Sequence, residues 1–226
     1  MPWDFTGLKG QINQRGAGGN WLCEECNNNT GSWYMSEYVN MSHVLHALIQ
    51  KEKFVPGNHY SFMLKDVYPM RIFKAVMTMF CDINHDCFGD NNLRKYLLDK
   101  ESTLFPSNKY EVYMYLISPG MCRVNSLSAM IIGNTNIMTS EISRYPVGFS
   151  LFIDKPSSYI PVGSLINDFA SISYDCKGDL RFDNIPYLEV NTQLPVDFRS
   201  KNEIKRTIDE TADSLNSLSP TFPPTV

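Results

Sequence analysis

The sequence predicts an α+β fold in which apolar helices are followed by an antiparallel β meander. Two observations support this prediction. Apolar side chains recur at helical spacing in three segments between residues 36 and 99, whereas residues 110–153 contain short β-rich runs separated by Pro-Gly, Gly-Asn and Tyr-Pro breaks. With 226 residues, 43% of them hydrophobic, the chain can bury a core of its own and needs no disulfide in order to fold.

Three helices are predicted in the first half of the chain. The first covers residues 36–51, where the apolar residues recur every three to five positions. The second covers residues 69–83 and begins with a proline, which is well placed at the first position of a helix. It is apolar on nearly all sides, so we expect it to be the central buried helix. The third is short, covers residues 93–99 and is capped by Asp90.

The strands are expected mainly in the second half. One strand, at residues 59–67, lies between the first two helices. The others are expected at residues 110–117, 127–133, 136–142, 147–153 and 187–190. The remainder of residues 156–199 is expected to be loop, and residues 201–218 form a weakly apolar helix before a Pro-rich tail.

Charge and hydropathy limit the classes of protein to consider. A net charge of −4 and a pI near 5.6 argue against a surface that is basic throughout, although they allow a local basic patch. No apolar run approaches the roughly 18 residues of a membrane-spanning helix, so we expect no membrane partner. The first residues do not resemble a signal peptide, which favours the cytoplasm. In that compartment the six cysteines are expected to be reduced thiols, some of them bound to metal.

One segment carries most of the chemistry, Cys23-Glu24-Glu25-Cys26-Asn27-Asn28-Asn29. The spacing of Cys23 and Cys26 allows both thiolates to bind one tetrahedral zinc ion, but a structural zinc site needs four ligands, so the motif supplies half of a site. A redox pair is the alternative; it is disfavoured because the Asn-rich sequence after Cys26 does not look like the helix start that such a pair needs. Cys122 and Cys176 are isolated and are expected to be ordinary thiols.

The segment from Leu22 to Tyr34, with the pattern Cys-x-x-Cys-Asn-Asn before a helix, resembles the second zinc knuckle of HNH-endonuclease-like proteins. Two later phrases resemble the region that follows the knuckle in one bacterial subgroup of that family. These phrases are Tyr68-Pro69-Met70-Arg71-Ile72 and Ser140-Glu141-Ile142-Ser143-Arg144-Tyr145-Pro146-Val147-Gly148-Phe149. The knuckle match covers about a dozen residues and is the more specific of the two.

This resemblance implies a particular division of the chain. Residues 1–35 would be the remnant of a ββα-metal, treble-clef-like zinc knuckle, residues 36–199 a helical plus antiparallel β accessory domain, and residues 200–226 a C-terminal helix and Pro-rich tail. In such proteins a histidine activates water, while Mg²⁺ or another divalent ion stabilises the phosphate charge. By position, Asn27, with Asn28 beside it, corresponds to the asparagine that steadies the catalytic loop.

The chain departs from this family pattern in two ways. No histidine and no second Cys-x-x-Cys precede Cys23, so both the general base and half of the zinc site are missing. We therefore expect an HNH-like protein that acts on nucleic acid but is incomplete or inactive as this chain. The alternative is a non-catalytic, metal-stabilised binding module. A second copy or another chain that completes the zinc site is a further expected partner.

Two groups of charged residues have both a functional and a structural interpretation. His43 and His46 lie one turn apart on the first predicted helix and could share a metal ion; we favour the alternative that one packs at the edge of the core and the other faces water. Arg71 and Lys74, with Lys65 nearby, could bind phosphate, although we favour solvated surface.

The aromatic residues and the remaining cysteines also allow two interpretations. Trp33, Tyr34 and Tyr38 could stack on unpaired bases, but at helical spacing after a knuckle such residues more often pack against the domain. Cys81 and Cys87 could complete the zinc site. Against this, Cys81 falls on the apolar second helix, where cysteine is commonly a small buried hydrophobic residue.

Overall fold

The structure, a computed structural model, describes residues 24–84, 89–119, 122–132 and 135–188. All of them belong to one compact unit, Gly18–Asp197. The helix expected at residues 201–218 lies outside the described residues. Among the helices that the structure describes, none combines the length and the apolar character needed to cross a lipid bilayer.

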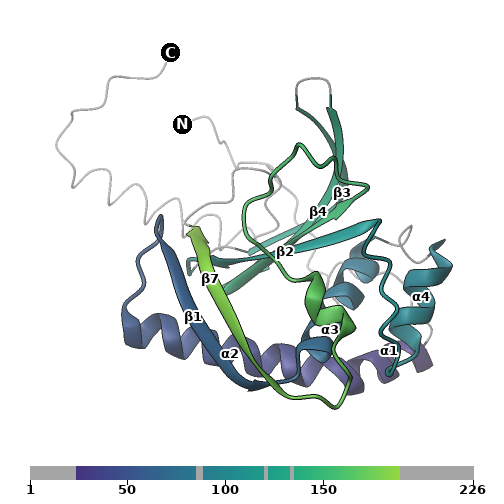
Figure 1. Ribbon diagram of the computed structural model, residues 1–226, viewed down its shortest axis with the longest axis horizontal. Helices are drawn as coiled ribbons and strands as arrows, with labels where there is room; N and C mark the ends of the chain where they lie inside the picture. The colour runs from purple at the N-terminus through teal and green to yellow at the C-terminus, as the bar shows by residue number, and fades with distance from the viewer. Residues whose placement is uncertain (1–23, 85–88, 120–121, 133–134, 189–226) are drawn as a thin grey trace, which may run out of the picture. The chain divides into compact units, whose positions relative to one another are not determined.

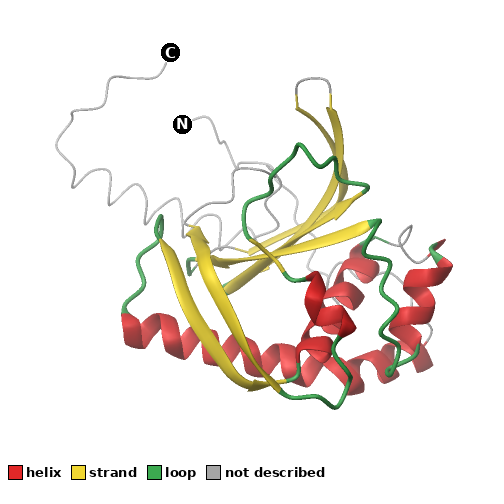
Figure 2. Cartoon of the chain, viewed as in Figure 1, coloured by secondary structure: helices red, strands yellow, loops and turns green. Residues whose placement is uncertain are grey.

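In the described part of the chain most helices precede most strands, with β1 between α2 and α3 (Figure 1, Figure 2). The helices are α1 (Glu24–Thr30), the π-helical η1 (Gly31–Met35), α2 (Ser36–Glu52), α3 (Pro69–Ile83), α4 (Asn91–Leu98) and the 3-10 helix η3 (Asn167–Ser171). The strands are β1 (His59–Val67), β2 (Tyr110–Ile117), β3 (Cys122–Ile132), β4 (Thr135–Arg144), β5 (Val147–Ile153), β6 (Ser164–Leu165) and β7 (Gly178–Leu188).

The strands form one mixed but mostly antiparallel sheet in the order β1-β7-β2-β5-β4-β3, with β6 paired to β2. Strands β3, β4 and β5 form the expected meander, and β2 pairs with β5. Only the β2–β7 pairing is parallel among the described pairs, and it joins two residue pairs, Leu116 with Tyr187 and Ile117 with Leu188. The α+β class with an antiparallel meander is thus confirmed.

Helix α3 is the central buried helix, as its composition predicts. Its bounds match the prediction, and it is buried on nearly every side. Figure 2 shows the helices gathered on one side of the strands. Side chains of α3 such as Phe73 and Val76 share a core with one face of the sheet, which contributes Val112, Met114 and Phe149. Burial of this apolar surface is the main favourable term in folding.

The opposite face of the meander is polar yet also buried. Tyr115 on β2 and Glu141 on β4 are fully buried, and the Tyr115 hydroxyl donates a hydrogen bond to the Glu141 carboxylate. The Tyr115 ring reaches Glu141 by lying across Gly148 on β5, between the two strands. A Cβ atom at residue 148 would lie 2.6 Å from the Tyr115 hydroxyl oxygen, so this crossing requires glycine.

The strand predictions fail where the apolar alternation is interrupted. Strand β7 begins at Gly178, nine residues before the predicted start. Its inward residues Leu180, Phe182 and Ile185 do not keep a strict period of two, because Asn184 has a positive φ of 56° and shifts the register. Likewise β3 begins at Cys122 rather than 127, and its pairing with β4 is irregular between residues 125 and 128.

The first helix also begins earlier than expected. We predicted a helix from residue 36 after a turn; instead the chain is helical from Glu24 through α1, η1 and α2 to Glu52. The hydroxyl of Thr30 donates to the carbonyl of Asn27, and that of Ser32 donates to the carbonyl of Asn29, so these residues return hydrogen bonds to the preceding turn. The π-helical turn at Gly31–Met35 accommodates Gly31, so the helix continues into α2.

Helix α4 is capped at its N-terminus by Asp90, as predicted. The Asp90 carboxylate accepts hydrogen bonds from the backbone N–H groups of Asn92 (2.9 Å) and Leu93 (3.2 Å). The ammonium of Lys109 and the hydroxyl of Tyr110 lie 2.9 and 3.0 Å from the same carboxylate. Although partial burial raises the pKa of Asp90, these hydrogen bonds outweigh burial and lower it to about 2.

The C-terminal end of α4 is bound by a lysine of the central helix. Lys74 is 0% exposed, and its ammonium donates to the carbonyl oxygens of Asp99 (2.8 Å) and Lys100 (3.0 Å). The same ammonium lies 4.3 Å from the ring centroid of Tyr96 and 5.7 Å from that of Tyr34. Burial lowers the pKa of Lys74 to about 8, although the carboxylates of Asp99 and Glu101 act in the opposite direction.

We predict that Lys74→Met lowers the free energy of unfolding by about 1–3 kcal/mol at neutral pH, because two inward-facing carbonyl groups lose their donor. The loss should grow between pH 8 and pH 9.5. In that window the lysine of the unfolded chain, with an ordinary pKa of 10.5, binds more protons than Lys74 does in the folded protein, so the contribution of Lys74 to stability rises with pH. Urea unfolding of both proteins across this range measures the difference.

Lys51→Met is the matched control, since Lys51 lies on α2 with 81% of its side chain exposed. It should change the free energy of unfolding by less than about 0.5 kcal/mol. The tyrosines do not interfere, because burial raises the pKa of both Tyr34 and Tyr96. A stability difference between the parent chain and Lys74→Met that stays constant from pH 7 to pH 9.5 would contradict a buried, charged Lys74.

Candidate functional site

The predicted zinc half-site lies at the edge of the described structure. Cys23 is outside the described residues, and of Cys26 only the backbone is described, as part of α1. Asn27 and Asn28, the two predicted catalytic residues, are exposed on α1. We expected Cys23 and Cys26 on a turn near the surface. From Glu24 onward the backbone is a helix, which directs successive side chains about 100° apart around its axis.

The other candidate metal ligands do not come together in what the structure describes. Cys81 is 0% exposed within the core around α3, which confirms its interpretation as a buried hydrophobic residue, while Cys87 lies outside the described residues. Cys176 is an exposed thiol. Within the described ranges, no three side chains of His, Cys, Asp or Glu are arranged so that they could hold one metal ion.

The aromatic residues after the motif pack against the domain, as expected. Tyr34 is 0% exposed, and its hydroxyl donates to the carbonyl oxygen of Leu97 on α4 (2.9 Å). Trp33 is half-buried and contacts Tyr34 edge to face, with 5.9 Å between ring centroids. Tyr38 packs against Phe149 of β5. These rings join the N-terminal helix to both α4 and the sheet.

The expectation that Arg71 and Lys74 form solvated surface is wrong. Lys74 is buried beside α4, and only 18% of the Arg71 side chain is exposed. The Arg71 guanidinium lies between two rings, 3.9 Å from the centroid of Tyr68 and 4.2 Å from that of Tyr174. It donates to the Tyr174 carbonyl (3.0 Å) and forms an ion pair with Asp175 (2.6 Å). Lys65, by contrast, is exposed.

Two exposed lysines extend this arrangement into a basic-aromatic stack, the name used here for Lys177, Tyr68, Arg71, Tyr174 and Lys100. The ammonium of Lys177 lies 5.1 Å from the ring centroid of Tyr68, and the ammonium of Lys100 lies 5.1 Å from that of Tyr174. Each tyrosine ring therefore contacts two cations, and each cation-π contact stabilises the arrangement by about 0.5–1 kcal/mol at an exposed site.

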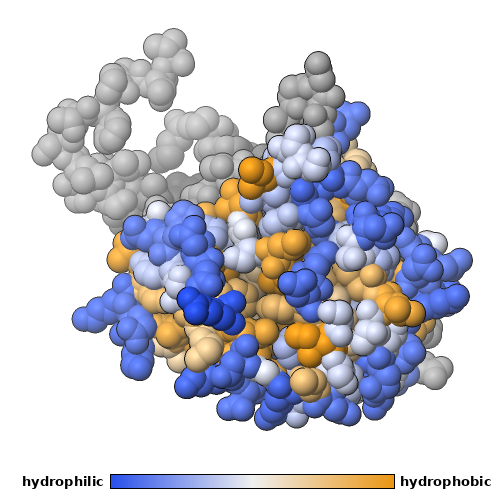
Figure 3. Space-filling model, viewed as in Figure 1, coloured by the Kyte–Doolittle hydropathy of each residue, from blue (hydrophilic) through white to orange (hydrophobic). Residues whose placement is uncertain are grey.

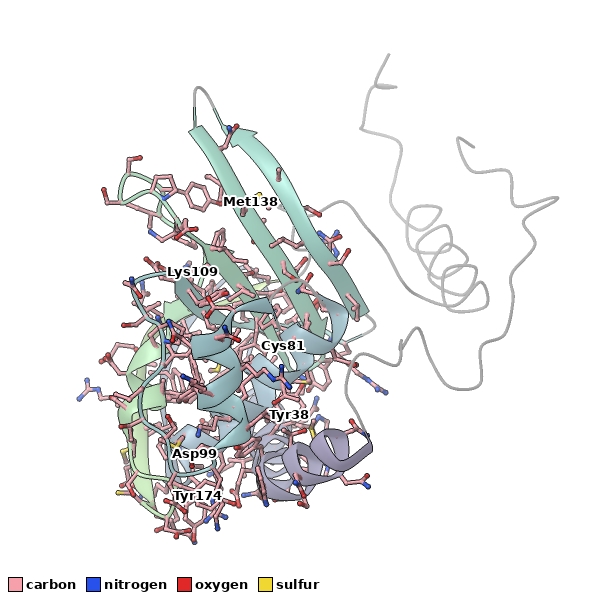
Figure 4. The ribbon with its side chains drawn as sticks, turned by 90° about the vertical axis from the view of Figure 1, so that its right-hand side faces the viewer. Tyr38, Cys81, Asp99, Lys109, Met138 and Tyr174 are labelled. Atoms are coloured by element: carbon pink, nitrogen blue, oxygen red, sulfur yellow. The ribbon has the colours of Figure 1, made fainter. Side chains whose placement is uncertain are left out.

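The stack is held beside Trp33 by a direct hydrogen bond. The Tyr174 hydroxyl donates to the backbone carbonyl of Trp33 at 3.1 Å. Tyr174 also contacts Tyr34 edge to face, at 6.3 Å. Figure 4 shows Tyr174 and Asp99 at one end of the molecule, away from Met138 on β4. The stack thus lies next to the helix that carries the Cys-Asn motif.

Lys177 is the cation of this region that is best placed to contact an anion. Arg71 and Lys100 pair with the carboxylates of Asp175 (2.6 Å) and Glu101 (3.7 Å), whereas Lys177 forms no ion pair among the residues that the structure describes. Arg71 is fixed by its rings and its carboxylate, whereas the ammoniums of Lys100 and Lys177 are carried by exposed residues. On the face shown in Figure 3, apolar side chains form separate small patches among polar ones.

His43 and His46 are both exposed, and His46 packs edge to face against Tyr145 at the edge of the core, as expected for one of the two. The structure places them together with Arg144 around a hollow between α2 and the β4–β5 turn. Nothing in the spacing of the two histidines indicates Arg144, which lies about a hundred residues later in the sequence. The stack was missed for the same reason, since Tyr174 contacts Arg71 of α3 and Lys177 contacts Tyr68 just before α3, about a hundred residues earlier in the sequence.

Comparisons with known protein families, with curated proteins and with solved structures found no match to this chain.

We predict that the described domain folds without metal, because its core is formed by α2, α3 and the sheet rather than by ligands around an ion. Thermal unfolding in the presence of a strong chelator should therefore differ little from unfolding in its absence. Cys26→Ser is the matched variant and should melt like the parent chain. A collapse of the melting transition on chelation would mean that a complete metal site holds the domain together.

Proposed function

We propose that this chain is an HNH-endonuclease-like protein that binds nucleic acid and does not itself cut it. The observation that carries the proposal is the basic-aromatic stack, which exposes Lys100 and Lys177 and is joined through Tyr174 to Trp33, four residues after the Cys-Asn motif. The motif suggests nucleic acid by resemblance, and the stack supplies a surface on which phosphate groups can bind. Neither argument depends on the other.

The stack suits the phosphate backbone better than it suits base stacking. Both tyrosine rings already contact cations, so their faces are occupied. Lys100 and Lys177 can instead pair with phosphate oxygens, as lysines do in most nucleic-acid complexes. Arg71 holds the rings of Tyr68 and Tyr174 in place, and each ring in turn contacts the ammonium group of one lysine. Binding of this kind is independent of sequence and is weakened by salt.

Phosphodiester hydrolysis is not supported by the positions of the histidines. A general base must lie within about 3 Å of the water that it activates. His43 lies sixteen residues after Asn27 on one continuous helical segment, which separates the two by about 24 Å along the helix axis. His46 lies one turn farther. Of the two, neither can serve as the base for a centre at Asn27.

The proposal includes a zinc ion at Cys23 and Cys26 and the groups that would complete its site. Zinc at Cys23 and Cys26 would be structural, and its other two ligands would come from elsewhere in this chain, from a second copy or from another protein. Mg²⁺ or a similar ion would be needed only if hydrolysis occurred. A cytoplasmic location agrees with thiolates that remain reduced for metal binding.

We predict that Lys100→Ala with Lys177→Ala weakens the binding of a fluorescent single-stranded oligonucleotide by about tenfold at low salt. The logarithm of the binding constant falls with the logarithm of salt concentration by about 0.7 per phosphate contact on single strands. Removal of two contacts should therefore reduce this slope by about 1.4. Fluorescence anisotropy over a series of salt concentrations, with DNA and with RNA, measures both quantities.

Lys51→Ala with Arg181→Ala is the matched control, because it also removes two exposed cations, each of them paired with a neighbouring carboxylate. It should leave the affinity within about twofold of the parent value. Equal losses in the two double variants would show that only net charge matters and would refute an interface at the stack. Absence of any salt-sensitive binding by the parent chain would refute nucleic-acid binding itself.

We also predict that the purified chain does not cleave plasmid or single-stranded DNA in Mg²⁺ or Mn²⁺. General-base help is commonly worth about 10²–10⁴ in rate, and neither His43 nor His46 lies close enough to Asn27 to supply it. Gel assays beside an Asn27→Ala variant test this. Robust cleavage that the variant abolishes would overturn the prediction and assign Asn27 to a working catalytic centre.

A further inference from the structure

The hollow between α2 and the β4–β5 turn has the size of a small-molecule site. Its volume is about 320 Å³, at the lower end of the range of about 300–1,000 Å³ found for ligand pockets. One wall is a face of α2 and the other is the turn that contains Arg144 and Pro146. The hollow is distinct from the basic-aromatic stack, since His43 follows Trp33 by ten residues, or about 15 Å along the helix.

Three side chains around the hollow can donate hydrogen bonds to an anion. His43, His46 and Arg144 are all exposed there, and none of the described residues that line the hollow is a carboxylate. Within the described part of the chain Arg144 forms no ion pair, so its guanidinium is available. A planar guanidinium binds two phosphate oxygens at once, and two imidazoles one turn apart can add further donors. The charges are therefore complementary to a phosphate group.

One of these donors is held in place by its neighbours. The Tyr145 hydroxyl lies 3.0 Å from Nδ1 of His46 and accepts a hydrogen bond from Nε2 of Gln50 at 3.3 Å. Its own proton can then be donated to Nδ1, which leaves Nε2 of His46 as an N–H donor for a ligand. The two rings meet edge to face at 5.5 Å. Such preorganisation lowers the entropic cost of binding.

Besides Ser42 and Tyr145, three further side chains give the hollow an apolar part, which a phosphate ion alone would not need. Tyr38 and Val39 line it from α2, and Pro146 lines it from the turn. Val39 is 44% exposed although it is apolar, and Tyr38 is held by its contact with Phe149. A flat aromatic group can cover these three side chains while an attached phosphate reaches the guanidinium and the imidazoles.

We infer that this hollow binds a nucleoside monophosphate, with the phosphate at Arg144, His43 and His46 and the base on Tyr38, Val39 and Pro146. This site does not depend on the proposed binding of nucleic acid at the stack. Recognition rests on one terminal phosphate and one aromatic ring, which together match the charge and the volume of the hollow.

Isothermal titration calorimetry of the full chain with AMP, with adenosine and with inorganic phosphate tests the inference. AMP should bind, and both adenosine and phosphate should bind at least about tenfold more weakly, because each lacks one half of the ligand. Absence of AMP binding at millimolar concentration would overturn the assignment. Phosphate binding as tight as AMP binding would also overturn it, since the apolar wall would then have no role.

Variants of exposed side chains locate the site without disturbing the core. Arg144→Gln and His43→Ala should each weaken AMP binding by about tenfold, and Val39→Glu, which adds a negative charge to the rim, should abolish it. Arg181→Gln removes an exposed arginine elsewhere and should have no effect. Unchanged AMP affinity in both Arg144→Gln and Val39→Glu would place binding outside the hollow and refute the inference.

The stack variants separate this inference from the proposed function. Lys100→Ala with Lys177→Ala should weaken oligonucleotide binding and leave AMP binding unchanged, if both proposals hold. If the parent chain does not bind the oligonucleotide, while it binds AMP and Arg144→Gln weakens that binding, the result supports the monophosphate site and refutes the proposed binding of nucleic acid. If AMP does not bind and Arg144→Gln weakens the binding of the oligonucleotide, the hollow is part of the nucleic-acid interface. The assignment to a nucleoside monophosphate is then overturned.

Discussion

The buried ammonium of Lys74 determines how the helices of this protein meet. It lies on the central helix α3 and binds the carbonyl groups of Asp99 and Lys100, where α4 ends and the partial negative charge of that helix is concentrated. Tyr34 and Tyr96 surround it, and their hydroxyls donate to carbonyl groups of α4 and of η3. Elements from four parts of the chain thereby converge on one charge.

The basic-aromatic stack follows from this arrangement. Arg71 precedes Lys74 by three residues, so both side chains leave α3 on neighbouring parts of one face. Lys100 belongs to both groups, because its carbonyl accepts the hydrogen bond from Lys74 while its ammonium lies over Tyr174. The surface that we propose for phosphate binding therefore combines loop residues, among them Lys100 and Lys177, with Arg71 of α3, and Lys74 binds one of these loops from within the core.

Sequence reasoning predicted the elements whose signals are local. The bounds of α3, β1, β2 and β5 were predicted correctly, because their apolar runs end at clear breaks. The surroundings of Arg71 and Lys74 were not predicted, because the groups that bury these two residues, such as Tyr174 and Asp99, come from other segments of the chain. Likewise His43 and His46 were identified as a pair, whereas Arg144 joins them only through the fold.

The pairing of β1 with β7 has a consequence for the order in which the protein is made. Leu64 lies opposite Leu180, so β1 leaves the ribosome more than a hundred residues before its partner. At about 5–20 residues per second, this delay lasts about 6 to 23 s. During that time the apolar side chains of α3 and the unpaired edge of β1 are both exposed. Until β7 is translated, early collapse or chaperone binding would protect this edge from pairing with other chains.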